Sequence, residues 1–353
     1  MSGSGAIGAT GIARVLRWLK APADVAMILT GSKSFANPVI GSERLNRHGL
    51  HVWRTRLAHR LAAARRHRLS HLVSIEDREA YAADGFVTKR DFLPAPVFAG
   101  LVKAVMAADA PAREMREGDA VTRRIVVTDT YLRRVPEMRA LLDHPVWRGL
   151  TRYVASFDEE PIVSVQTIFG KAAGSTEDPQ TSLHMDTFHP TMKAWFFLHD
   201  VADDEGPFTY VPGSHRVSAR RLAWQKRQSI VASSGTDRKG GAFRLRPAQL
   251  ARLGWPAPTR FAVPANTLVV GDTCGFHARA HSTKPTMRIE IYCSSRPNPF
   301  KPFIGLGLDR VPFLGRQREL VGWWLQDRLA PLGLTRPIWR DAGILTPDAP
   351  SRG

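Results

Sequence analysis

Two histidines and one aspartate are spaced so that they could bind a single metal ion. His184 and Asp186 lie two residues apart in SLHMD, and on a strand both side chains would point to the same face. His277 follows much later, after the apolar strand-like run TLVVGD, and a β-barrel can bring such distant strands together. Two histidines and one carboxylate are typical of non-haem Fe(II) sites with open positions, whereas zinc more often takes a fourth, closing ligand. These residues therefore predict a catalytic iron site.

Arg288 is placed to bind a dicarboxylic co-substrate. It opens the strand-like run RIEIYCSS, which follows His277 in the chain. A buried guanidinium can bind a carboxylate through two parallel hydrogen bonds, while the other end of the dicarboxylate chelates the metal. The alternative is an ion pair with Asp272 or Glu290, in which Arg288 would be structural.

At these residues the sequence resembles the phytanoyl-CoA dioxygenase family of Fe(II)- and 2-oxoglutarate-dependent oxygenases. The resemblance covers roughly residues 166–300 and, more loosely, the segment around Gly85. It implies that His184, Asp186 and His277 bind the iron. It also implies that Arg288 binds the distal carboxylate of 2-oxoglutarate.

Further positions match the family less tightly. Trp195, in KAWFFLHDV, matches a tryptophan beside the co-substrate, and Lys171, in FGKAAG, falls at a family lysine. The segment GPFTYVPGSH, residues 206–215, matches a signature that follows the iron-binding strand. Gln166 precedes Lys171 on the same predicted strand, where it faces either the co-substrate or the core. We expect Trp195, Lys171 and Gln166 to contribute to the co-substrate site.

The resemblance also implies a fold and a reaction. The fold would be mainly β, with a double-stranded β-helix (jelly-roll) core and helices packed on one face. Dioxygen and 2-oxoglutarate would be converted to succinate and CO2 while the substrate is hydroxylated, and Asp186 favours hydroxylation because related halogenases carry a small residue there. The expected substrate is a small-molecule or lipid-like metabolite, with an anionic group as one option. The alternatives are a hydroxylase or demethylase of nucleic acid or protein, and a non-catalytic binding module.

The elements that must position these residues change character at Pro161. Residues 75–150 alternate helical patterns with polar turns and predict a helical layer. Beyond Pro161, short β-rich runs broken by Gly, Pro and Asp predict an antiparallel barrel or sandwich. We expect a basic helical N-terminal extension (1–75), an oxygenase domain including its helical layer (76–305) and a C-terminal helical extension (306–353).

Positive charge is concentrated near the N-terminus of a chain whose net charge is +18. Residues 12–20 predict a short basic amphipathic helix, and residues 43–71 predict a longer one. The second helix carries an apolar stripe at helical spacing, formed by Leu50, Trp53, Leu57 and Leu61. The first interpretation packs this stripe on the domain, and the alternative is a peripheral contact with an acidic membrane or another anion. No nucleic-acid-binding motif accompanies the charge.

Composition and cysteine content predict a folded protein in a reducing compartment. With 43% hydrophobic and 23% charged residues, the chain can bury a core and is unlike disordered proteins. Cys274 and Cys293 are too few for a disulfide framework. No apolar run approaches the roughly 20 residues that span a bilayer, and no signal peptide is evident. We therefore expect a cytoplasmic protein, with peripheral membrane contact as the alternative.

Overall fold

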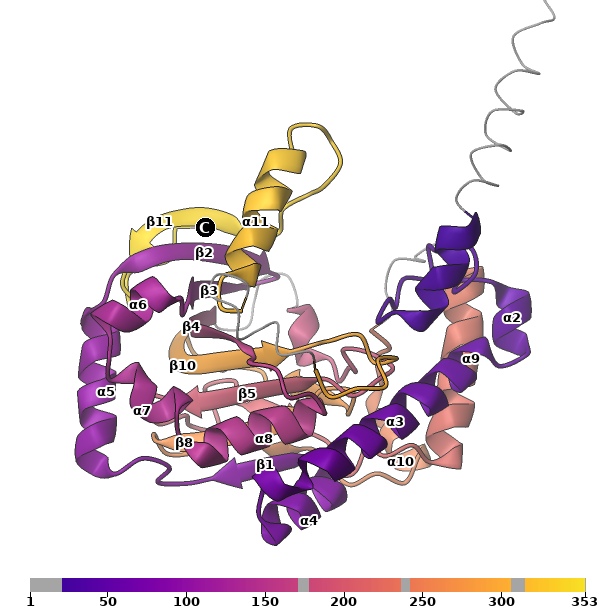
Figure 1. The fold of residues 1–353 in the computed structure, drawn as a ribbon, viewed down its shortest axis with the longest axis horizontal. Helices are drawn as coiled ribbons and strands as arrows, with labels where there is room; N and C mark the ends of the chain where they lie inside the picture. The colour runs from indigo at the N-terminus through magenta and orange to yellow at the C-terminus, as the bar shows by residue number, and fades with distance from the viewer. Residues whose placement is uncertain (1–20, 171–177, 236–241, 306–314, 353) are drawn as a thin grey trace, which may run out of the picture.

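The computed structural model describes residues 21–170, 178–235, 242–305 and 315–352 (Figure 1). The helix predicted over residues 12–20 and the predicted co-substrate residue Lys171 lie outside these ranges. Among the described residues, no helix has the length and apolar character needed to cross a membrane.

The larger of two antiparallel sheets has eight strands, in the order β1-β8-β5-β10-β4-β3-β2-β11 (Figure 1). Their bounds, in this order, are Phe86–Lys89, Thr267–Asp272, Met192–Phe197, Thr286–Ser295, Ile162–Gly170, Ala120–Val126, Ala110–Glu117 and Arg340–Leu345. The long central strand β10 pairs with β4 on one side and β5 on the other, so Tyr292 lies opposite Ser164 and Trp195.

The smaller sheet has the order β7-β6-β9, with bounds Thr259–Arg260, Phe208–Tyr210 and His277–Arg279. Trp195 and Tyr292 of the larger sheet form one buried cluster with Phe208 and Tyr210 of the smaller sheet. Two antiparallel sheets that share an aromatic core form a jelly roll, and the predicted fold class is confirmed.

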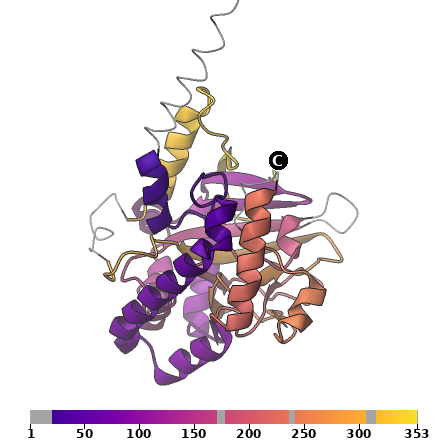
Figure 2. The ribbon, with the colours of Figure 1, turned by 90° about the vertical axis from the view of Figure 1, so that its right-hand side faces the viewer.

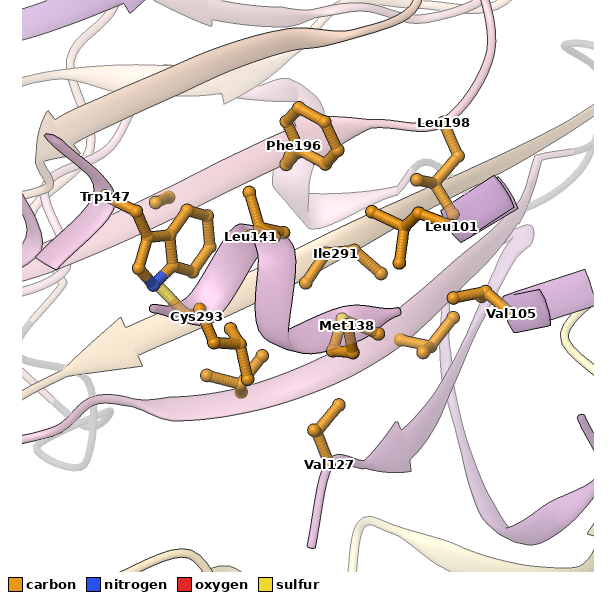
Figure 3. Close-up of a cluster of buried hydrophobic side chains, with 14 of the residues drawn as sticks. Leu101, Val105, Val127, Met138, Leu141, Trp147, Phe196, Leu198, Ile291 and Cys293 are labelled. Carbon is orange, nitrogen blue, oxygen red and sulfur yellow. The ribbon is translucent and has the colours of Figure 1, made fainter. Parts of the chain in front are cut away.

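Helices cover the outer face of the larger sheet. They are α5 (Ala95–Ala107), α7 (Met138–Leu142) and α8 (Pro145–Ala155). Leu101, Leu141 and Trp147 from these helices contact Phe196 and Ile291 from the sheet, and Figure 3 shows the helical side chains lying over the strands. All five are almost fully buried, and burying each such side chain contributes roughly 1.5–3 kcal/mol. This core fixes the strands that carry the site.

The remaining helices surround the open end and edges of the barrel. They are α2 (Glu43–Arg47), α3 (Leu50–Leu69), α4 (Ile75–Asp84), α6 (Asp129–Arg134), α9 (Ala219–Ser234), α10 (Pro247–Arg252) and α11 (Arg318–Leu329). Short 3-10 turns occur at Met27–Leu29, Ser70–Leu72 and Pro179–Thr181. Helices α3 and α9 run side by side in both views (Figures 1 and 2).

The inward face of α3 differs from the prediction. The expected apolar stripe does not form the packed face, because Trp53 is 48% exposed and the buried positions include Arg54, Ala58 and Arg65. The buried arginines are satisfied by backbone carbonyls: Arg54 donates to Ile28, Thr30 and Ser32, and Arg65 to Ser156, Pro299 and Lys301. The packing prediction was wrong because these arginines, rather than the leucines, have partners in the fold.

Strands also occur in segments that the sequence predicts as helical. The hairpin β2–β3 lies within residues 75–150 and turns at Gly118, where φ is 58°. Strand β11 lies in the predicted C-terminal helical extension and pairs with β2 at the sheet edge. Strand β2, APAREMRE, is rich in good helix formers, so cross-strand pairing overrides its local propensity.

Candidate metal centre

The backbone ties the three predicted metal ligands together. His184 lies in the segment between β4 and β5 and pairs with His277 of β9, each residue donating its N–H to the other's carbonyl at 2.9 Å. Asp186 donates its backbone N–H to Thr273, which follows β8, also at 2.9 Å. Residues far apart in the sequence therefore meet at one end of the barrel.

The ligand atoms of His184, Asp186 and His277 all lie within 4.8 Å of one another. The Asp186 Oδ1 atom is 3.8 Å from His184 Nε2 and 3.6 Å from His277 Nε2. His184 Nδ1 lies 2.8 Å from the Ser182 carbonyl, and His277 Nδ1 lies 2.9 Å from the Gly275 carbonyl. Each Nδ1 must carry the proton to donate to its carbonyl, so each Nε2 presents a lone pair toward the shared centre.

The electrostatic environment keeps His184 and Asp186 in the forms that bind metal. Burial, and then the neighbouring His277, lowers the pKa of His184 to about 3, so its imidazole is neutral at neutral pH. Burial raises the pKa of Asp186, but the adjacent Lys193 ammonium outweighs it and holds that pKa well below its usual range. Lys193 Nζ lies 2.7 Å from Asp186 Oδ2. The carboxylate is therefore ionised.

The donor set fits an Fe(II) ion. His277 Nε2 is buried and has no hydrogen-bond partner, which is costly unless a ligand fills the site. Two neutral imidazoles and one carboxylate on the same side of the centre leave room for further ligands, as in non-haem iron enzymes. Of the nearby histidines, His189 is buried with its Nδ1 3.0 Å from the Pro190 carbonyl, and His281 is exposed. Neither belongs to the cluster of three.

The three ligands open into a cavity of about 530 Å³. Arg288 lines it, donating from Nε to Glu290 at 3.0 Å and from Nη1 to the Gly206 carbonyl at 2.7 Å. Of the two acidic partners considered for Arg288, the structure shows Glu290, whereas Asp272 pairs with Arg66 at 3.1 Å. No described residue accepts from Nη2 of Arg288, so this nitrogen remains available to a ligand.

Two other predicted co-substrate residues also line the cavity. Trp195 stacks on Phe208 with ring centroids 4.1 Å apart. Gln166 donates to Glu290 at 2.7 Å and accepts from Arg124 Nε at 3.0 Å. Gln166 is thus satisfied within the protein while its side chain borders the cavity.

The signature over residues 206–215 supports the strand that carries His277. Tyr210 donates its hydroxyl to the Asp272 carbonyl at 2.7 Å, and Ser214 Oγ accepts the backbone N–H of Phe276 at 2.8 Å. Gly275 passes so close to Tyr210 that a Cβ there would lie 1.9 Å from the hydroxyl. The signature therefore fixes the backbone on either side of the His277 ligand.

Several residues at the site were not predicted from the sequence. Lys193 forms an ion pair with Asp186. It lies two residues before Trp195 on β5, so the sequence could have placed both side chains on the same face of the strand. Lys33 donates from Nζ to the Asp186 carbonyl at 2.5 Å, and Arg296 lines the cavity beyond the end of β10. Burial, followed by repulsion from Arg296, lowers the pKa of Lys33 to about 8. No local pattern marks Lys33 or Arg296.

Residues 81–251 match the model of the phytanoyl-CoA dioxygenase (PhyH) family. The match contains His184 and Asp186 and ends before His277 and Arg288. No curated protein matches the chain.

Three solved structures illustrate the range of similar folds. The epimerase SnoN, in complex with Fe3+, alpha ketoglutarate and nogalamycin RO, is 20% identical, with a TM-score of 0.41 over 62% of this chain and 81% of SnoN. HygX from Streptomyces hygroscopicus, with nickel, 2-oxoglutarate and hygromycin B bound, is 13% identical (TM-score 0.38; 64% and 88% covered). EctD from S. alaskensis with bound Fe is 15% identical (TM-score 0.39; 70% and 84% covered). The family assignment therefore rests on the match over residues 81–251.

Proposed function

Since residues 81–251 form a domain of the phytanoyl-CoA dioxygenase family of Fe(II)- and 2-oxoglutarate-dependent oxygenases, we propose that the chain hydroxylates a small-molecule or lipid-like metabolite and releases succinate and CO2. The observation that carries this proposal is the buried cluster of His184, Asp186 and His277, whose donor atoms converge at the cavity. Iron with 2-oxoglutarate and dioxygen supplies the oxidation of an unactivated C–H bond.

The protein's own groups would orient the metal. His184 and His277 would bind through Nε2, because each Nδ1 is committed to a backbone carbonyl. Lys193 forms an ion pair with Asp186 Oδ2, while Asp186 Oδ1 lies near both imidazoles. Asp186 would therefore bind through Oδ1 alone, which leaves more of the metal's positions for reactants.

Arg288 would hold the distal carboxylate of 2-oxoglutarate. Its Nε and Nη1 atoms are bound to Glu290 and Gly206, and these contacts hold the guanidinium while Nη2 stays available. Trp195 and Gln166 line the same cavity and would border the co-substrate. The aromatic residues between the two sheets, Trp195, Phe208 and Tyr292, would provide an apolar wall beside the reacting end.

The cavity favours a small molecule over the alternative substrates. A volume of about 530 Å³ lies within the usual range for small-molecule sites. A nucleic-acid or protein substrate would also need an extended surface for its polymer, and the sequence offers no such recognition motif. The intact ligand cluster argues against a non-catalytic binding module.

An anaerobic titration tests the proposal. Adding Fe(II) and 2-oxoglutarate to the metal-free chain should produce a weak visible metal-to-ligand charge-transfer band, and His281→Ala should give the same band. Asp186→Gly should lose the hydroxylation of any substrate found by screening for succinate release. The proposal fails if the unmodified chain gives no band at saturating iron and 2-oxoglutarate.

We also propose a peripheral contact between α3 and acidic lipid. The outer face of this helix exposes Trp53 beside Arg56 and Arg60, and together with Lys226 they line a shallow groove. An exposed aromatic side chain flanked by cations suits the interface of an acidic membrane.

A further inference from the structure

The cavity at the metal centre carries more positive charge than its protein partners neutralise. Six cationic side chains line it: Lys33, Arg124, Lys193, Arg279, Arg288 and Arg296. Four of them pair with acids: Lys193 with Asp186, Arg288 with Glu290, Arg279 with Asp178 and Arg124 with Glu319. Among the described residues, no acidic side chain pairs with Lys33 or Arg296.

The two cations without an acidic partner lie together and beside the metal ligands. Lys33 Nζ donates to the Asp186 carbonyl, and Arg296 is close enough to repel the Lys33 ammonium. Arg296 is exposed, and no described residue accepts a hydrogen bond from its guanidinium, so it stands at the mouth of the cavity. Two like charges held near one another in a partly buried site are unfavourable, and the nearby Asp186 carboxylate that attracts both is already paired with Lys193. An added anion would therefore stabilise them.

Lys33 and Arg296 lie toward the other end of β10 from Arg288. Arg288 and Tyr292 lie on one face of β10, because alternate residues of a strand face the same way, and Arg296 directly follows the end of the strand. All three line the cavity. Ser294 pairs with Lys193, the residue that contacts Asp186, whereas Arg288 lies near the other end of the strand and contacts Gly206. A co-substrate that reaches from the metal to Arg288 therefore leaves Lys33 and Arg296 unoccupied.

We propose that Lys33 and Arg296 bind an anionic group of the substrate, a carboxylate or a phosphate, and so select acidic metabolites. This inference rests on the proposed function, because it places the anion beside the same metal centre. The ammonium and the guanidinium offer charge-assisted hydrogen bonds, and the planar fork of Arg296 suits two oxygens of one anion. The oxidised carbon would then lie a short distance from the anionic end of the substrate.

The segment that supplies Lys33 lies outside the family match, which begins at residue 81. It is held in place by Arg54, whose guanidinium donates to the carbonyls of Ile28, Thr30 and Ser32. Substrate selection would therefore depend on a segment that the family match does not contain.

The test uses the full chain, loaded anaerobically with Fe(II) and saturating 2-oxoglutarate. Isothermal titration calorimetry would compare hexanoate, hexyl phosphate and 1-hexanol, which share a chain and differ in the anionic group. At least one anion should bind about tenfold or more tightly than hexanol, and Arg296→Gln should weaken that anion by about tenfold without changing hexanol binding. Whichever anion binds more tightly identifies the group as carboxylate or phosphate.

Two further variants separate this site from general charge effects. Lys33→Met should also weaken anion binding, whereas the Arg133→Gln/Arg139→Gln variant removes two exposed cations outside the cavity and should bind the anion normally. The inference is overturned if neither anion binds more tightly than hexanol, or if Arg296→Gln binds the anions like the unmodified chain. The charge-transfer band, recorded on the same samples, reports separately whether the iron and 2-oxoglutarate site exists.

Discussion

Asp186 uses its two carboxylate oxygens for different purposes. Oδ2 forms a 2.7 Å ion pair with Lys193, while Oδ1 faces His184 and His277. The ammonium stabilises the ionised carboxylate and restricts its rotation, so a bound metal would meet a single, oriented oxygen. Lys193 thus acts as a positioning residue for the ligand.

Replacing His277 with Ala should abolish Fe(II) binding. Two remaining ligands hold iron poorly, and the expected loss of affinity exceeds the roughly 10–100-fold that loss of an outer-shell contact causes. Equilibrium dialysis with Fe(II) measures this effect. His281→Ala serves as the matched control because His281 is exposed, and the assignment fails if that variant loses iron while His277→Ala keeps it.

Replacing Arg288 with Met should raise the 2-oxoglutarate concentration needed for the charge-transfer band, with iron affinity little changed. Truncating one member of a buried charge pair costs about 2–5 kcal/mol, but part of that cost reflects the buried partner Glu290. The Arg288→Met/Glu290→Gln double variant separates the two contributions. If the double variant regains normal 2-oxoglutarate affinity, Arg288 serves the ion pair and does not bind the co-substrate.

Some residues of the site can be predicted from the sequence, whereas others are identified only by the structure. His184 and Asp186 form a short HxD pattern, and together with the distant His277 and Arg288 they match the iron-binding pattern of the family, so the sequence predicts them. Lys33 and Arg296 are ordinary cations in sequence terms, because only the folded chain brings them to the cavity. The predicted roles of Trp195, Gln166 and Lys171 stay predictions.

At the scale of the element, α3 shows how a basic helix can be partly internal. Arg65 is 1% exposed, stacks on Phe157 and donates to three backbone carbonyls of other segments. Arg66 also points inward, to Asp272. These arginines connect α3 to the barrel as hydrophobic residues would in an ordinary amphipathic helix.

Replacing Arg65 with Met should lower the free energy of unfolding by about 3–5 kcal/mol, because buried carbonyls would lose their donor. Urea denaturation measures the change. The exposed Arg60→Gln on the same helix should stay within about 0.5 kcal/mol of the unmodified chain. Equal stabilities for the two variants would show that the internal hydrogen bonds contribute little.

Acidic vesicles should bind the full chain at low salt and release it at high salt, since the contact is electrostatic. Co-sedimentation with acidic and neutral liposomes measures this binding. Arg56→Gln/Arg60→Gln should reduce it, and Trp53→Ser tests the apolar part. Arg65 and Arg66 are unsuitable for this test because their partners lie inside the protein. The lipid contact is refuted if the unmodified chain ignores acidic vesicles at low salt.

The prediction of helices, strands and their buried faces failed where tertiary contacts override the local preference of the sequence. The β-rich runs that became β4, β5, β8 and β10 consist of residues that favour strands, and the sequence predicts them well. The inward face of α3 instead depends on carbonyls contributed by distant segments, which no helical period reveals.

At the scale of the whole molecule, buried histidines link stability to pH. Burial is the main cause that lowers the pKa values of His51, His189 and His215 to about 3. The unfolded chain takes up protons near the ordinary pKa of about 6.5, while the folded chain resists protonation. The contribution of these neutral histidines to the free energy of unfolding is therefore fully present above pH 6.5. It is lost progressively as the pH falls from 6.5 toward 3.

The metal-free chain should consequently unfold at lower urea concentration at pH 5.5 than at pH 7.5, with each such histidine contributing about 1.4 kcal/mol per pH unit below 6.5. His51→Phe offers a control, since the ring lies among Phe35, Phe188 and Phe243 and phenylalanine does not titrate. That variant should show a shallower pH dependence. Identical unfolding curves at the two pH values would contradict the explanation.

The global fold follows from the β-rich pattern beyond Pro161, because alternating short strands leave few architectures other than two packed sheets. The part played by the N-terminal segment does not follow in the same way. Its basic composition suggests an appendage, yet Phe35 and Ala58 share a buried cluster with Met185 and Phe188 beside the metal ligands. The expected boundaries near residues 75 and 305 stay predictions.

The reciprocal backbone pairing of His184 and His277 implies a preorganised binding site. Backbone hydrogen bonds between the two residues hold their imidazole ring centroids 4.5 Å apart. The two side chains therefore need little further ordering to bind an ion. Metal exchange should then leave the fold intact, and other divalent ions that accept nitrogen and oxygen ligands should compete for the same position. Selection for iron would depend on which metals the cell supplies, since the scaffold itself is ready for any of them.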